Sequence, residues 1–293
     1  MNTTPSSPLR QRAVVLGGGG SAGNAWLIGI IAGLFDAGLD VTGADLIVGT
    51  SAGATAAAQI TGAGTHDLMA ATQVTPPQRA ASGATAAGMT DHLARTGQII
   101  ADSRDAADMR RRMGAAALEL AAGSDSPERW RAIVAARLPR QDWPQQRVLI
   151  TAVDVGTGEP VVFDSDSGVD LVDAVAASTA GGFAYRIGER WYIDGGYRTN
   201  ADNADLASGY ERVLVLSPLG GRARTPQEWG MHLATQVEEL RAGGSRAETV
   251  FPDSAALAAF GDNMMDPFTR PPAARAGYAH GTALAEQLAG LWR

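Results

Sequence analysis

Residues 13–23 read AVVLGGGGSAG and residues 46–54 read LIVGTSAGA, and each stretch is a short apolar run followed by a glycine-rich turn. Helix-compatible residues follow both turns, from Asn24 to Phe35 and from Ala52 to about Ile60. A strand, a turn and a helix repeated in this way predict a parallel sheet with right-handed crossovers. The sequence therefore indicates the α/β class.

The rest of the chain supports a single domain. Apolar runs predict further strands at residues 147–155, 161–163, 190–193, 212–218 and 249–251. Residues 62–145 instead read as helices separated by Gly, Ser and Pro. Helical stretches at 227–241 and 283–291 lie near the end of the chain. We expect one α/β domain over residues 13–293, with a helical insertion at about 62–145, after a disordered tail over residues 1–12.

Composition excludes several kinds of chemistry. The 293 residues carry 24 basic and 31 acidic side chains, a net charge of −7, which argues against a nucleic-acid partner. All the basic residues are Arg and Cys is absent, so catalysis by Lys or Cys is excluded. The four His residues lack H-x-x-x-H spacing, and we expect neither a metal nor a cofactor. No apolar run reaches about 18 residues and no signal peptide is evident, so we expect a cytoplasmic protein.

The first glycine turn, residues 17–23, places backbone N–H groups at the start of a helix, where they favour an anion. The spacing of Gly18, Gly20 and Gly23 matches the dinucleotide fingerprint, so an NAD(P) site is one alternative. However, the second strand ends in GTS rather than in the acidic residue that would bind a ribose. The N–H groups of Gly18, Gly19 and Gly20 can equally stabilise an oxyanion. We favour this reading over a nucleotide site and over a purely structural turn.

The second turn contains G-x-S-x-G at Gly49, Ser51 and Gly53. It lies between a buried strand and an Ala-rich helix, an arrangement that exposes a nucleophilic serine at the positive end of the helix dipole. Glycines are expected beside Ser51 because the sharp turn brings backbone segments too close for a Cβ atom. A serine that only caps the helix is the alternative. We predict that Ser51 is a nucleophile.

The third turn lies in RWYIDGGYRTN, residues 190–200, where an apolar strand ends in Asp194 and Gly195 and Gly196 turn the chain away. In a parallel sheet, the carboxyl end of a strand faces the crevice where ligands bind. We therefore expect Asp194 to meet Ser51 at this edge, although a hairpin Asp-Gly turn is an alternative. Burial there would raise the pKa of Asp194 and let it accept the serine proton.

A catalytic triad is a weaker alternative to this Ser–Asp pair. His232 or His280 could supply the base, since both follow the acid in the chain, as in α/β-hydrolases. Both histidines have helix-like surroundings and neither follows a strand. The candidate elbow also comes after only two strands, earlier than in that fold.

Taken together, the three turns resemble the patatin-like phospholipase family, with its glycine-rich loop, G-x-S-x-G and D-G-[GA] in that order. Ala177–Ala180 (ASTA) and Asn200 resemble further family positions, and the resemblance covers roughly residues 13–65 and 147–217. It implies a three-layer α/β fold with a mainly parallel central sheet flanked by helices. It also implies a lipid acyl hydrolase that uses a Ser–Asp dyad and a glycine-rich oxyanion hole, without a metal or cofactor.

Three positions depart from the family pattern. Ala22 stands where the family usually has a basic residue, and Gly182 and Asp202 replace prolines. A neutral ester is therefore an alternative to a phospholipid substrate, and a degenerate, non-catalytic binding module is an alternative to an enzyme. We expect a lipid or ester substrate and peripheral contact with a membrane; the sequence does not specify an oligomeric state.

Residues of about 76–122 have two interpretations. They contain Pro76-Pro77 and, further on, Met109 and Met113 beside Arg110–Arg112. The spacing of the methionines favours a helix packed on the core. The alternative is a mobile cover over the Ser51 crevice, whose arginines would meet anionic head groups.

Overall fold

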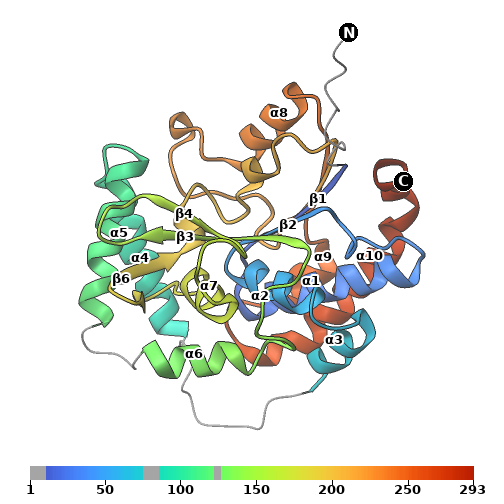
Figure 1. The fold of residues 1–293 in the computed structure, drawn as a ribbon, viewed down its shortest axis with the longest axis horizontal. Helices are drawn as coiled ribbons and strands as arrows, with labels where there is room; N and C mark the ends of the chain where they lie inside the picture. The colour runs from blue at the N-terminus through green and yellow to red at the C-terminus, as the bar shows by residue number, and fades with distance from the viewer. Residues whose placement is uncertain (1–10, 75–85, 122–126) are drawn as a thin grey trace.

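The computed structural model describes residues 11–74, 86–121 and 127–293, with the backbone only for residues 86–90. Figure 1 shows a central sheet with helices on both of its faces. The sheet has 8 strands within the described residues, in the order β5-β6-β3-β2-β1-β7-β8, and β4 pairs with β3. Their bounds are β1 (Arg12–Leu16), β2 (Leu46–Gly49), β3 (Arg147–Asp154), β4 (Pro160–Phe163), β5 (Tyr185–Ile187), β6 (Arg190–Asp194), β7 (Arg212–Leu216) and β8 (Arg246–Val250).

The sheet is mainly parallel, as predicted, because β3, β2, β1, β7 and β8 all run in one direction. β6 runs antiparallel to β3, so Asp194 does not end a parallel strand and that part of the prediction is wrong. The register nevertheless brings Asp194 close to the end of β2. Gly49, the last residue of β2, pairs with Ile150 of β3, and Asp194 pairs with Ala152, two residues further along the same strand. Ser51, two residues beyond Gly49, lies level with Ala152 and hence with Asp194.

The helices surround this sheet. Within the described residues, five of them lie between β2 and β3, and four of these five fall in the stretch 62–145 that was expected to be helical. In Figure 1, α4 and α5 stand at one end of the molecule and α1, α3 and α10 towards the other. Their bounds are α1 (Gly20–Asp36), α2 (Ala52–Ile60), α3 (Thr65–Thr72), α4 (Ala86–Ala101), α5 (Ala106–Ala121), α6 (Pro127–Ala135), α7 (Leu171–Ser178), α8 (Leu233–Ala242), α9 (Ser254–Phe260) and α10 (Arg270–Trp292).

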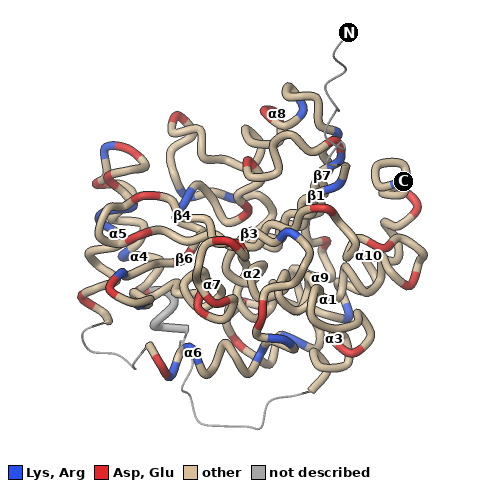
Figure 2. The backbone as a smooth tube through the Cα atoms, in the orientation of Figure 1, with Lys and Arg blue, Asp and Glu red and all other residues tan. Residues whose placement is uncertain are grey.

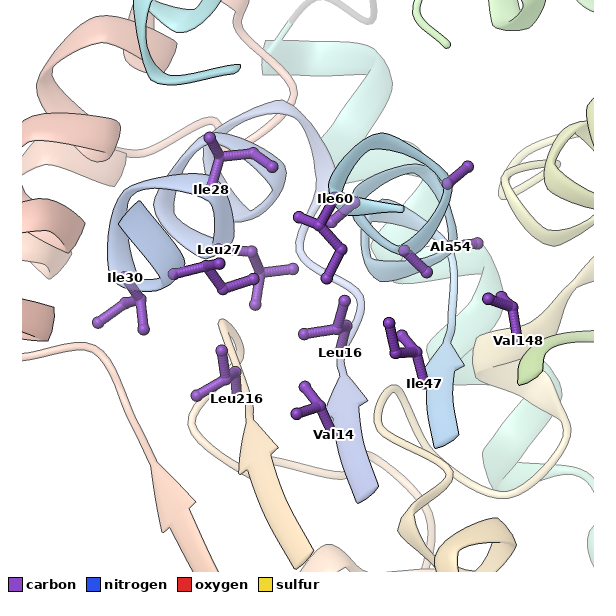
Figure 3. Close-up of a cluster of buried hydrophobic side chains, with 14 of the residues drawn as sticks. Val14, Leu16, Leu27, Ile28, Ile30, Ile47, Ala54, Ile60, Val148 and Leu216 are labelled. Atoms are coloured by element: carbon purple, nitrogen blue, oxygen red, sulfur yellow. The ribbon is translucent and has the colours of Figure 1, made fainter. Parts of the chain in front are cut away.

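Alternation along β1 divides the core between the two faces of the sheet. Val14 and Leu16 point towards α1 and α2. Figure 3 shows this cluster, with the strands β7, β1 and β2 on one side of it and the two helices on the other. Ala13 and Val15 point to the opposite face, into a second cluster that includes residues of the segment 204–210 and of α8. Since successive residues of a strand face opposite sides, a strand buried on both faces is apolar throughout, as the AVVL run is.

α1 and α10 pack in parallel along their whole length. A Cβ on Gly29 would lie 2.1 Å from the Ala274 carbonyl oxygen, and one on Gly277 would lie 2.5 Å from the Trp26 carbonyl oxygen. These positions need glycine because the two helix backbones touch there. α10 is longer than the predicted 283–291, since prolines are tolerated in the first turn of a helix. The N-terminal ends of the two helices therefore lie together.

Other elements differ from expectation at their ends. α8 begins at Leu233 rather than at residue 227, because Gly230 takes a left-handed φ of 66° and interrupts the helical stretch. β8 ends at Val250, one residue before the end of the predicted strand, and starts three residues earlier. β5 was missed because three residues are too few to show an alternating pattern. Residues 1–10 of the predicted tail lie outside the described residues, and Arg12 already belongs to β1.

Met109 and Met113 of α5 are buried against residues of β3 and β6, which confirms the packing interpretation of this helix. Arg110 is held between the chain segments that follow β3 and β6, where it donates hydrogen bonds to the carbonyl oxygens of Gly158 and Arg198. Pro76-Pro77, part of the alternative cover, lie outside the described residues. α5 is thus a packed helix.

Candidate active site

Ser51 lies at the sharp turn between β2 and α2. Its φ of 54° and ψ of −116° are unusual for a residue with a side chain, which marks local backbone strain. A Cβ on Gly53 would lie 1.9 Å from the Leu16 carbonyl oxygen, and one on Gly49 would lie 2.7 Å from the Ala54 Cα atom. Ser51 stands at the N-cap position of α2, but its side chain makes no capping hydrogen bond. The hydroxyl is therefore not used to begin the helix.

Asp194 lies next to this serine. Its side chain is 9% exposed, and burial raises its pKa from the usual 3.8 to about 6. Hydrogen bonds from the Gly196 N–H, at 2.7 Å, and from the Ser51 side chain act in the opposite direction and favour the carboxylate. The structure thus brings together the two side chains that the sequence singled out, although 143 positions separate them (194 − 51).

The ASTA segment at the end of α7 forms hydrogen bonds with both Ser51 and Asp194. The Ser178 hydroxyl accepts a hydrogen bond from the Ser51 N–H at 2.9 Å, and the Ala180 carbonyl accepts one from the Asp194 N–H at 3.1 Å. Ser178 is fully buried. The segment therefore fixes the backbone of Ser51 relative to that of Asp194.

A buried polar cluster that the sequence reasoning missed lies beneath the two residues. The Thr50 and Thr151 hydroxyls are 2.9 Å apart, and the Asn203 amide donates to Thr50 and to the Gly195 carbonyl. All three side chains are fully buried, and Asn203 has a left-handed φ of 56°. Single polar residues on three separate segments form no sequence pattern. Only the position of Asn203 shortly after the family-like Asn200 hinted at a role.

The glycine-rich turn leads directly into α1, which begins at Gly20 with a φ of 62°. The Gly18 N–H already donates to the Ala201 carbonyl oxygen at 2.8 Å. The N–H groups of Gly19 and Gly20 have no acceptor among the described residues. Gly18 also lies beside the serine, since a Cβ on it would be 3.4 Å from the Ser51 Cβ atom. Of the three predicted oxyanion donors, Gly19 and Gly20 are therefore the unoccupied ones.

Asp202, at one of the positions that depart from the family pattern, is buried beneath the same turn. Its carboxyl Oδ1 atom has no hydrogen-bond partner, and a Cβ on Gly17 would lie 2.2 Å from it. Burial raises its pKa from 3.8 to about 7, and a hydrogen bond with Ser217 offsets part of this effect. The carboxyl is thus a second titratable group near the glycine-rich turn.

The two histidines of the triad alternative lie elsewhere. His232 precedes α8, and its ring nitrogen is 2.9 Å from the Thr225 carbonyl oxygen. His280 lies in α10, with its ring 6.5 Å from that of Trp26. Neither contributes to the pKa of Asp194. These contacts give no support to a triad.

A narrow cavity adjoins Asp194 on the side of α4 and α5. Gly181 lines it, and a Cβ there would lie 3.5 Å from the Asp194 Oδ2 atom. Most of the lining is apolar, with His92 and Arg95 from α4 also present; the apolar part includes Ile99, Met113, Ala116, Ala117, Leu120 and Ile193.

These features define an α/β protein with a candidate serine-hydrolase site. The chain belongs to the patatin-like phospholipase family, which matches residues 14–207, more than half of its length. This match confirms the resemblance seen in the three turns and supports a lipid hydrolase. No curated protein matches the sequence.

Two solved structures are similar to the chain in fold. VipD from Legionella pneumophila is 14% identical with a TM-score of 0.46, and the match covers 96% of this chain and 68% of that one. The type III effector protein ExoU is 16% identical with a TM-score of 0.40, and the match covers 96% of this chain and 54% of that one.

Among the described residues, no helix is both long and apolar enough to cross a membrane.

Proposed function

We propose that the protein hydrolyses carboxylic esters of lipids, with Ser51 as the nucleophile and Asp194 as the base. The observation that carries the proposal is the position of the serine at the strained turn beside the buried Asp194 carboxyl, where its side chain favours the carboxylate. A serine hydroxyl is a weak nucleophile unless a neighbouring base takes its proton. Asp194 is suited to this task, because a pKa near 6 leaves it ionised at neutral pH yet more basic than an ordinary carboxylate.

The reaction then has two halves. The Ser51 oxygen attacks the acyl carbonyl carbon while Asp194 takes the hydroxyl proton, and the negative charge moves to the carbonyl oxygen. The N–H groups of Gly19 and Gly20 stabilise that oxyanion, and Gly18 joins them only if it releases Ala201. The ester C–O bond breaks and the leaving alcohol takes the proton from Asp194. Water repeats the cycle on the acyl-enzyme, giving the free acid and the original serine.

The substrate class follows from the surroundings of the carboxyl. The family is one of phospholipases, and the cavity beside Asp194 has a mainly apolar lining. An NAD(P) site is less well supported, because no acidic residue follows β2 and the N–H groups at the start of α1 lie beside Ser51. A lipid with at least one acyl ester is the substrate that fits best.

The test combines labelling with turnover. The wild-type protein should react with a fluorophosphonate and hydrolyse p-nitrophenyl butyrate, and Ser51→Ala should lose both properties while it keeps its thermal unfolding midpoint. Ser254→Ala, at the exposed start of α9, is the matched control and should behave as the wild type. Turnover by Ser51→Ala above a few per cent would contradict the assignment. Micromolar binding of NAD(P) without any turnover would favour the nucleotide alternative.

A further inference from the structure

The parallel packing of α1 and α10 places Arg270, the first residue of α10, at the first turns of α1. One of its guanidinium nitrogens donates to the Asn24 Oδ1 atom at 3.0 Å and to the Ser21 carbonyl oxygen at 3.4 Å. A helix N-terminus is electropositive, so a second positive charge there is unfavourable unless an anion compensates it. Arg270 lies outside the part of the chain that the family match covers.

Among the residues that the structure describes, no acidic side chain pairs with Arg270. Burial lowers the pKa of Arg270, and the other charge acting on it is Arg137, which lowers the pKa further. Neither arginine forms an ion pair within the described residues, and the nearby Asp266 carboxyl accepts the Phe268 N–H instead. The remaining guanidinium nitrogens of Arg270 have no protein partner there, yet they are not among the enclosed polar atoms. They are therefore accessible to a ligand.

Arg137 completes the positive site from another segment. It follows α6, is exposed, and stacks over the Trp130 ring at 5.3 Å. Figure 2 shows basic residues on the chain between the labels of α6 and α3. Asn24 bonds to Arg270 and to Gln59, and Gln59 donates to the Arg137 carbonyl oxygen, so the two arginines lie near each other beside the first turns of α1. This is the arrangement that binds phosphate in proteins.

We propose that Arg270 and Arg137 bind the phosphate group of a lipid substrate, an inference that rests on the proposed ester hydrolysis. Two observations favour a lipid as the source of the phosphate. Asn24, which accepts a hydrogen bond from Arg270, also donates one to the carbonyl oxygen of Ala52, so a single side chain connects Arg270 to the residue after Ser51. Met265 and Phe268, just before Arg270, are 45% and 47% exposed, which suits the apolar part of a lipid.

The site would supply a cation that the glycine-rich turn lacks. Position 22 in that turn is a fully buried alanine, whose N–H donates to the Met264 carbonyl oxygen. The segment that contains Met264 thus fixes the start of α1, and Arg270 follows it directly. A charge-assisted hydrogen bond to a phosphate is worth about 1.5–3 kcal/mol, which corresponds to roughly 10- to 100-fold in kcat/KM.

The experiment compares two soluble substrates, a short-chain diacylphosphatidylcholine below its critical micelle concentration and the p-nitrophenyl ester of the same acid. In Arg270→Gln, the ratio of kcat/KM for the phosphate-bearing substrate to that for the uncharged ester should fall at least tenfold. Arg137→Gln, which replaces an exposed residue, should also lower this ratio. Arg275→Gln, on the same helix and bonded to Gln73, is the matched control and should leave it unchanged.

A second measurement separates this site from catalysis. In the Ser51→Ala background, inorganic phosphate should raise the thermal unfolding midpoint, and Arg270→Gln should abolish that rise. An unchanged ratio in both arginine variants would overturn the proposal, even if phosphate binds, because the site would then serve a free anion. Equal losses on both substrates would also overturn it, by assigning Arg270 a structural role. If no ester is hydrolysed, the proposed function fails, and the absence of phosphate binding would then overturn the anion site as well.

Discussion

Asp202→Asn should make the protein more stable above neutral pH. The carboxyl of Asp202 is 2% exposed, one of its oxygens has no partner, and its pKa is raised by burial to about 7. In the unfolded chain the same group has the ordinary value of 3.8. A group whose pKa is higher in the folded protein stabilises it fully below the unfolded value, and the stability is lost as pH rises through the folded value.

The magnitude follows from the two pKa values. At alkaline pH the folded protein must bury an ionised carboxylate, whereas the unfolded chain ionises it in water. A difference of about 3 between the pKa values corresponds to about 4 kcal/mol in total, of which about 3 kcal/mol develops between about pH 5 and about pH 8. Asparagine has nearly the same size and cannot ionise, so Asp202→Asn avoids this cost. If the unpaired amide of the new asparagine lowers the free energy of unfolding, that decrease should not depend on pH.

The measurement is urea-induced unfolding followed by tryptophan fluorescence over this pH range. The free energy of unfolding of Asp202→Asn, relative to the wild type, should rise by about 3 kcal/mol from about pH 5 to about pH 8. Asp262→Asn, which changes an exposed aspartate, is the control and should show a much smaller pH dependence. A relative stability of Asp202→Asn that stays constant or falls with pH would refute the reasoning, because the carboxylate would then have a partner when folded.

Three further results are expected. The kcat/KM for ester hydrolysis should fall as pH decreases through about 6, because Asp194 must be ionised to accept a proton, and Asp194→Asn should be inactive at every pH; undiminished activity well below this pH would exclude Asp194 as the base. Asn203→Ala should lower the free energy of unfolding by about 2–4 kcal/mol, because it removes two buried hydrogen bonds that the Asn203 amide donates, to the Thr50 hydroxyl and the Gly195 carbonyl, and two that its oxygen accepts, from the side chains of Arg198 and Thr199; a loss of only a few tenths of a kcal/mol in urea unfolding would contradict this role. Ala116→Phe, which fills the cavity beside Asp194, should reduce hydrolysis of long-chain p-nitrophenyl esters more than that of the acetate; equal effects on both would place the acyl chain elsewhere.

Much of the fold was predictable because the deciding signals are local. Both strand–turn–helix units need glycine where the backbone turns sharply or segments touch, as at Gly53 against Leu16, and this requirement is visible within a few residues of sequence. Strands buried on both faces appear as short apolar runs for the same reason. Ser51 was chosen as the candidate nucleophile from its immediate neighbours alone. Asp194 was chosen as the candidate base from an assumed parallel strand that is in fact antiparallel.

The sequence by itself therefore determined the α/β class, the glycine-rich turns and the serine at the second of them. Strand direction and register, which bring Asp194 level with Ser51, depend on pairing between distant segments and were settled only by the tertiary structure. The tertiary structure also decided that the Gly18 N–H donates to Ala201, that Asp202 is buried and that Arg270 bonds to Asn24 of α1. The pKa of a carboxyl or the partner of a guanidinium depends on which groups surround it in space. Residues far apart in the chain supply those surroundings, so no local pattern records them.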